Sequence, residues 1–328
     1  MQKVTSIEFF RFLFMLQVCL WHFGHLNGLM TNGYIAVEFY FILSGYLLYI
    51  SQKKKISALD YSINKMKRIL PRITFAYLLG GVIYIDTIVD NPLKVFNDIF
   101  FISSSGLTSF RGVLNPLWYI SAYIIGSSLI FSLLNFNKRL TINNILPIST
   151  LLVYTFILNH NNFSLESRET YFCLHIPFWR GVAGMSLGCF LCKIQEIKKN
   201  SIDEKYNLVL NILSIISLIV SLLYIFIHAN EDAYMLFIYC CIILSAFSPT
   251  SVFNRLFNQK IWLKLGGCSL DMLIIHPFII RIVRYISNNI IQLNEWTLVY
   301  VYIILVVVSS LLFSRMYQTF MRKQKVFQ

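Results

Sequence analysis

Apolar stretches of about 20 residues recur from one end of this sequence to the other, and short polar turns separate them. A helix of about 20 apolar residues spans the hydrocarbon core of a bilayer. Only 13% of the 328 residues are charged and 57% are hydrophobic, whereas about 25% of an ordinary soluble domain is charged. The sequence therefore excludes a soluble globular fold and predicts an all-α, polytopic bundle of membrane helices.

Hydropathy and the charged turns together predict ten transmembrane helices. We expect them at about residues 4 to 29, 34 to 51, 69 to 89, 114 to 135, 142 to 159, 171 to 192, 206 to 228, 232 to 249, 264 to 287 and 296 to 317. No internal repeat or long linker divides the chain. Residues 1–328 are thus expected to form one membrane domain, with no extra soluble domain.

Basic residues are distributed unequally between the two predicted sides of the membrane. Alternate loops and the two chain ends hold 21 Lys and Arg residues, the other loops hold five, and two fall inside spans. Because cytoplasmic loops collect basic residues, we expect both termini in the cytoplasm. The net charge of +13 then reflects membrane topology rather than nucleic-acid binding.

The cysteines and glycines predict packing rather than chemistry. The seven cysteines are odd in number and lie mostly in apolar runs, which does not favour a disulfide framework. Cys189 and Cys192 form a CxxC, but no second pair follows at zinc spacing, so no metal site is expected. Gly184 and Gly188 form a GxxxG that predicts close helix packing.

The first predicted span carries the densest set of ionisable residues: Glu8, Arg11, His22 and His25. Charged groups inside a membrane are costly, which makes each one a candidate functional residue. Eleven residues at about 100° each return to nearly the same azimuth, so Arg11 and His22 share one helix face about 16 Å apart. Arg11 is suited to holding an anionic group and His22 to proton transfer. Alternatively, Arg11 only reaches lipid phosphates and His22 only bonds a neighbouring helix.

Glu38 lies near the start of the second span, at about the depth of His22 and His25. A carboxylate beside an imidazole would fix its tautomer, so we expect Glu38 in one cavity with a histidine. A solvated position at the membrane interface is the alternative.

Three more polar residues fall inside later spans. Arg180 lies on the sixth predicted span, and Asp271 and His276 lie on the ninth. Pro277 follows His276 and frees a backbone carbonyl one turn earlier. His276 is also compatible with a plain packing role beside a proline kink.

Five segments of the sequence stand in an order that is typical of one known family. They are SIEFFRFLFMLQVCLWHFGH at 6–25, GYIAVEFYFILSGYLL at 33–48, KMKRILPRI at 65–73, NPLWYISAY at 115–123 and LGGCSLDMLIIHPFI at 265–279. The first contains Arg-x10-His, from Arg11 to His22, and the second places Glu38 before aromatic residues and a Ser-Gly pair. Together they resemble the acyltransferase 3 family of integral-membrane O-acyltransferases, which decorate bacterial surface glycans. One departure is that Leu270 and Leu273 stand where aromatic residues usually precede the late histidine.

The resemblance implies an enzyme of a bacterial plasma membrane. It would move an acyl group, most often acetyl, from cytoplasmic acyl-coenzyme A to a sugar hydroxyl of an extracytoplasmic or lipid-linked polysaccharide. Acyl-coenzyme A (acetyl-CoA in the usual case) is then a donor substrate rather than a bound cofactor. The expected partners are that glycan acceptor and membrane lipids, with no nucleic acid.

The resemblance also implies roles for individual residues. Arg11 would bind phosphate or polarise the thioester carbonyl, His22 would act as general base, and Glu38 would complete the catalytic set. The residues expected to bind donor or acceptor are His25, Ser44, Arg68, Arg72, Trp118, Arg180 and His276. Direct transfer and a covalent acyl-histidine both fit this pattern, as do acetyl and longer groups such as succinyl.

A transporter or flippase of glycan precursors is the rival interpretation. Intramembrane Arg, His and Glu residues that line a path would serve it equally well. The lack of a transporter-like repeat in the sequence favours the enzyme.

Overall fold

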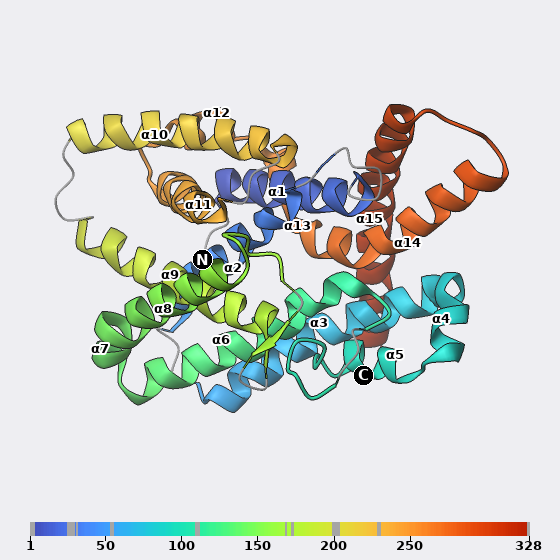
Figure 1. Ribbon diagram of the computed structural model, residues 1–328, viewed down its shortest axis with the longest axis horizontal. Coiled ribbons are helices and arrows are strands. Elements are labelled where there is room, and N and C mark those ends of the chain that lie inside the picture. The colour runs from blue at the N-terminus through green and yellow to red at the C-terminus, as the bar shows by residue number, and fades with distance from the viewer. Residues whose placement is uncertain are drawn as a thin grey trace.

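The computed structural model describes residues 4–24, 30, 32–52, 56–108, 112–167, 169–171, 174–198, 204–227 and 231–326. Its long helices are α1 (Thr5–Gly24), α2 (Ala36–Ser51), α3 (Ala58–Gly80), α6 (Trp118–Phe136), α8 (Leu146–His160), α9 (Ile176–Lys198), α10 (Glu204–Leu223), α11 (Asp232–Phe247), α14 (Ser269–Asn289) and α15 (Glu295–Val326). In Figure 1, α10 lies on the opposite side of the molecule from α4 and α5, with α1 and α2 between them. The described chain is thus a polytopic helix bundle.

Short helical segments and one small hairpin connect the long helices. The segments are η2 (Gly33–Ile35), η3 (Gly81–Tyr84), α4 (Ile85–Asp90), α5 (Leu93–Ile99), η4 (Asn115–Leu117), α7 (Lys138–Leu140), η5 (Thr141–Ile145), η6 (Tyr224–Phe226), α12 (Val252–Leu256) and α13 (Lys260–Gly267). The hairpin pairs β1 (Thr170–Tyr171) with β2 (Leu174–His175) in antiparallel register.

A helix occupies each of the ten expected positions, but fewer segments meet the requirements of a membrane span. Among the described residues, seven segments are long and apolar enough, or eight if the pair α13 and α14, bent by 52°, is one span. Helix α11 has only 16 residues, whereas a perpendicular span needs about 20. Helix α9 carries Arg180 in its apolar part and Lys193 and Glu196 near its end. The protein is therefore a multi-pass membrane protein, with fewer qualifying spans than the ten expected.

Helices α2 and α9 form the tightest pair in the bundle. A Cβ atom added to Gly45 would lie 1.8 Å from the carbonyl oxygen of Met185, and one added to Gly188 would lie 1.9 Å from that of Ile42. Glycine at both positions lets the two backbones touch, and for Gly188 this is the close packing that the GxxxG pattern predicted. This close approach fixes the α2 residues that face α9.

Helix α1 packs against the bent pair formed by α13 and α14. A Cβ atom added to Gly266, near the end of α13, would lie 2.2 Å from the carbonyl oxygen of Glu8. The hydroxyl of Ser269 donates to the Gly266 carbonyl over 2.7 Å across the bend. As a result, the first turns of α14 lie beside the middle of α1 (Figure 1).

The connection between α4 and α6 is organised around Asp98 of α5. Its Oδ2 accepts from the Tyr77 hydroxyl over 2.5 Å and from the Leu114 amide over 3.0 Å. Burial raises the pKa of the Asp98 carboxyl to about 7, and the hydrogen bonds to Tyr77, Leu114 and Val113 oppose that rise. These bonds fasten residues 112–114, which lead directly into η4 and the site described next.

Candidate active site

Two cavities lie inside the bundle and share part of their walls. The smaller, here the His22 cavity, has a volume of about 240 Å³. The larger, here the Arg11 cavity, has a volume of about 1040 Å³. Arg11 and His22 lie in phase on α1, as the sequence predicted. Arg11 lines the larger cavity and His22 lines the smaller one.

The Arg11 cavity is strongly basic. Its lining includes six basic side chains, which are Arg11, Lys65, Arg68, Arg72, Lys264 and Arg315. Among the described residues, no acidic side chain lines it. The expected site residue Ser44 lies on its wall as well. Such a cavity attracts an anion with several negative charges.

Ion pairs behind the cavity wall hold two of these arginines. The guanidinium of Arg11 donates to both carboxylate oxygens of Glu8, over 3.0 and 2.9 Å. That of Arg72 donates to Asp271 over 2.8 Å, and Asp271 is fully buried. These pairs fix the orientation of both guanidinium groups, so a ligand meets arranged donors rather than mobile side chains.

Lys65 and two other basic residues were not singled out from the sequence. The Lys65 ammonium donates to the Ser127 hydroxyl over 3.1 Å and lies 3.7 Å from the centre of the Tyr123 ring. Lys264 lies in the last turn of α13 and Arg315 lies on α15, so only the folded bundle brings them to Arg11. A general excess of basic residues at helix ends was the only signal in the sequence.

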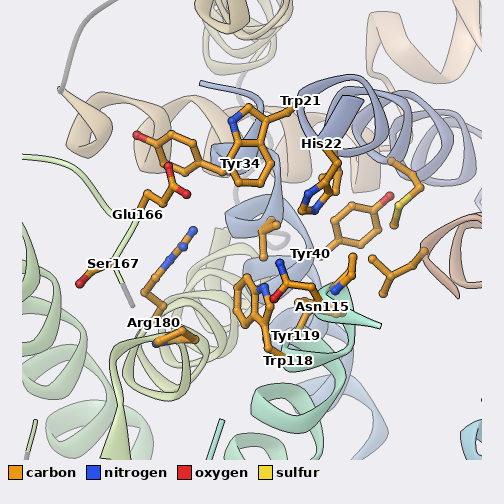
Figure 2. Close-up of a pocket in the computed structure, with 16 residues that line it drawn as sticks. Trp21, His22, Tyr34, Tyr40, Asn115, Trp118, Tyr119, Glu166, Ser167 and Arg180 are labelled. Carbon is orange, nitrogen blue, oxygen red and sulfur yellow. The ribbon is translucent and has the colours of Figure 1, made fainter. Parts of the chain in front are cut away.

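The His22 cavity has aromatic and polar walls. Figure 2 shows His22 and Tyr40 on one side of it and Arg180, Glu166 and Ser167 on the other, with Asn115 and Trp118 between. Trp118 also contacts Arg180, whose guanidinium carbon lies 5.7 Å from the Trp118 ring centre. The expected residues His22, Trp118 and Arg180 thus meet at one cavity, while His25 lies outside the described residues.

Glu38 is fully buried and pairs with Arg180. It does not line the His22 cavity, and its Oε1 accepts from Arg180 Nε over 2.7 Å. Its Oε2 accepts from the Tyr154 hydroxyl over 2.6 Å. Glu38 therefore lies behind Arg180, a residue 142 positions further along the chain that does line the His22 cavity. Whether Glu38 also shares a cavity with His25 stays a prediction, because His25 lies outside the described residues.

The ion pair with Glu38 leaves one side of the Arg180 guanidinium available to a ligand in the His22 cavity. Arg180 is 2% exposed, and its Nη2 has no hydrogen-bond partner among the described residues. A buried guanidinium nitrogen without an acceptor is costly, and a ligand oxygen in the cavity would relieve that cost. Arg180 is therefore suited to hold a polar or anionic group of a ligand.

A second histidine lies directly behind His22. The ring centres of His22 and His276 are 5.1 Å apart with a 31° angle between the planes. Nδ1 of His276 lies 3.0 Å from the Met272 carbonyl, which can only accept, so Nδ1 carries the proton. Nε2 of His276 is buried with no partner among the described residues. His276 thus presents an unused acceptor next to His22.

Comparison with known proteins places most of the chain in one family. A family described as an acyltransferase domain matches residues 4–315. O-acetyltransferase OatA of Staphylococcus aureus strain NCTC 8325 / PS 47 is 25% identical over 335 residues, which covers 88% of this chain and 52% of that protein. OatA of strain COL gives the same values. The chain thus spans about half the length of these relatives, and no solved structure matches it.

Proposed function

Because this chain belongs to the acyltransferase 3 family that its residues 4–315 match, we propose that it is a membrane O-acyltransferase of glycans. In this proposal it transfers an acetyl group from acetyl-coenzyme A to a sugar hydroxyl of an extracytoplasmic or lipid-linked polysaccharide. The similarity to O-acetyltransferase OatA supports acetyl as the group transferred. The observation that carries the proposal is a basic cavity that meets a histidine cavity at the middle of α1.

The Arg11 cavity is the proposed donor site. Coenzyme A carries a pyrophosphate and a further phosphate, and arginine and lysine are the side chains that bind such groups. A volume of about 1040 Å³ is large enough for a ligand of that size. Arg68 and Arg72 keep the donor-binding role expected of them, and Lys65, Lys264 and Arg315 join them.

Arg11 and His22 have separate roles in this proposal. They lie about 16 Å apart along α1, so Arg11 cannot polarise a carbonyl that reacts beside His22. In the proposal Arg11 binds the donor's anionic part, and the thioester end reaches toward His22.

His22 acts as the general base in this scheme. Its imidazole takes the proton of the acceptor hydroxyl as that oxygen attacks the thioester carbonyl. The new ester bond forms, the carbon–sulfur bond breaks, and the leaving thiolate takes up the proton from the imidazolium. His276 supports His22 from behind, and Arg180 holds a polar group of the sugar.

Glu38 has a positioning role in this proposal. It touches Arg180 rather than the reacting atoms, so it orients the guanidinium and balances its charge. This replaces the catalytic role that the sequence resemblance implied for Glu38.

An assay in liposomes tests the enzyme against the glycan transporter. The purified protein is given labelled acetyl-coenzyme A and a glycan acceptor, and ester and free coenzyme A are measured. His22→Ala should lower the rate at least about 10²-fold, the usual size of a general-base effect. His160→Ala is the matched control, because His160 is 46% exposed and pairs with Glu169 away from both cavities. Near wild-type ester formation by His22→Ala would remove His22 from the mechanism, and no donor turnover by the wild type would favour transport.

A further inference from the structure

The two cavities meet at four side chains that line both of them. These residues, here called the neck, are Met15, Tyr40, Tyr119 and Leu273. Each comes from a different helix, namely α1, α2, α6 and α14. A group that passes from the Arg11 cavity to His22 must therefore pass between four separate helices.

The position of Met15 on α1 places the neck within reach of a thioester. Met15 lies about 6 Å along the helix axis from Arg11 and about 10 Å from His22. A donor held by Arg11 would thus bring its acyl group through the neck before it reaches His22. The neck is the part of the route that both cavities share.

Two sides of the neck are held in place by neighbouring groups. The Tyr40 hydroxyl donates to the backbone carbonyl of Arg11. The Tyr119 ring lies 4.8 Å from that of Phe41 and stacks with that of Tyr123 at an angle of 7°. The two phenol rings are therefore rigid walls.

The other two sides are apolar and buried. Met15 is 3% and Leu273 is 5% exposed. None of the four neck side chains carries a charge at neutral pH, so the neck offers nothing to balance a carboxylate on the acyl group. The His22 cavity beyond has only about 240 Å³ to hold both the acyl group and the acceptor hydroxyl.

We propose that the neck selects the acyl group by length and charge, and that Met15 and Leu273 are its specificity-determining residues. It admits acetyl to His22 and disfavours butyryl by bulk and succinyl by both bulk and charge. The inference rests on the proposed acyltransferase function and adds the class of donor, a short neutral acyl-coenzyme A.

The test compares acetyl-, propionyl-, butyryl- and succinyl-coenzyme A in the liposome assay with one acceptor. One methylene group too many in a fitted apolar site typically costs about 10-fold or more in kcat/KM. We expect the wild type to prefer acetyl to butyryl by at least that factor. Met15→Ala and Leu273→Ala should each raise the butyryl-to-acetyl ratio of kcat/KM at least about tenfold, because each removes bulk where the two cavities meet. Succinyl should gain less, because the widened neck still lacks a cation.

Matched variants separate the neck from cavity size in general. Leu47→Ala enlarges only the Arg11 cavity and Val18→Ala only the His22 cavity, so both should keep the wild-type ratio. Met15→Leu conserves side-chain volume and should also keep the wild-type ratio. A ratio measured within one preparation does not depend on the fraction of folded protein, which guards against variants that fold poorly.

Three results would each overturn the inference while leaving the acyltransferase function intact. The first is a wild type that uses butyryl and acetyl donors equally well. The second is an unchanged ratio in both neck variants, and the third is an equal rise of the ratio in Leu47→Ala and Val18→Ala. No turnover of any donor by the wild type would overturn the proposed function and this inference together.

Discussion

His22 and His276 show how a single buried atom can matter at the site. The Met272 carbonyl fixes the tautomer of His276, so its Nε2 can accept a proton but not donate one. In the proposed transfer His22 becomes protonated, and the His276 ring, whose centre lies 5.1 Å away, can help to stabilise it. His276 is in this view a positioning residue that acts through His22.

We expect two substitutions of His276 to differ in activity. His276→Gln retains an acceptor near the position of Nε2, whereas His276→Asn retains only a donor toward Met272. His276→Asn should lower kcat by about 10-fold or more, with KM for acetyl-coenzyme A little changed, while His276→Gln retains more activity. Equal loss of kcat in both variants would indicate a packing role instead.

The ion pair between Glu38 and Arg180 leads to a second prediction at the residue scale. Glu38→Gln removes the ion-pair partner of the buried Arg180, and breaking a buried pair typically costs about 3 to 5 kcal/mol. We expect a clear fall in thermal stability in detergent. Glu38→Gln combined with Arg180→Gln should be more stable than Glu38→Gln alone but remain inactive, since the unpaired charge is gone and so is the cavity's guanidinium. If the double variant were no more stable than the single one, Arg180 would not be the main partner of Glu38.

At the scale of elements, hydropathy located the helices but not their contacts. The bilayer requires each backbone polar group to bond within its own helix, so apolar runs predict helices directly. The in-phase placement of Arg11 and His22 on α1 could be predicted for the same reason. The pairing of Glu38 with Arg180, and the arrival of Lys264 and Arg315 at the Arg11 cavity, depend on tertiary packing that periodicity does not encode.

The connection held by Asp98 should respond to pH. The pKa of this carboxyl rises from 3.8 to about 7 on folding, because burial disfavours its charged form. Between these two pKa values the folded state keeps the Asp98 carboxyl protonated, whereas the unfolded state releases the proton. The resulting stabilisation of the folded state is complete below the lower pKa and is lost as the pH rises through about 7. We expect the wild-type melting temperature to fall between pH 5.5 and pH 8, as about one proton per chain is released. Asp98→Asn should flatten this dependence, and an identical slope in the two proteins would contradict the assignment.

At the scale of the whole molecule, the two cavities give the membrane topology a functional meaning. The transferase that we propose takes its donor from the cytoplasm and modifies a glycan on the other side. The basic Arg11 cavity should therefore open to the cytoplasm, on the side where the excess of Lys and Arg predicts both termini. The His22 cavity should then open outward, with the neck between the two compartments.

Cysteine labelling of intact cells tests this orientation with two described positions. In a background without native cysteines, Lys138→Cys replaces an exposed residue in the connection after α6, and Asn289→Cys replaces one at the end of α14. The basic-residue distribution places the first in the cytoplasm and the second outside, so a membrane-impermeant thiol reagent should label only Asn289→Cys until the cells are permeabilised. Detergent-solubilised protein, in which both sites should react, controls for accessibility. The reverse pattern would put the Arg11 cavity on the outer side, where a cytoplasmic acyl-coenzyme A cannot reach it, and would thereby contradict the proposed route of transfer as well as the topology.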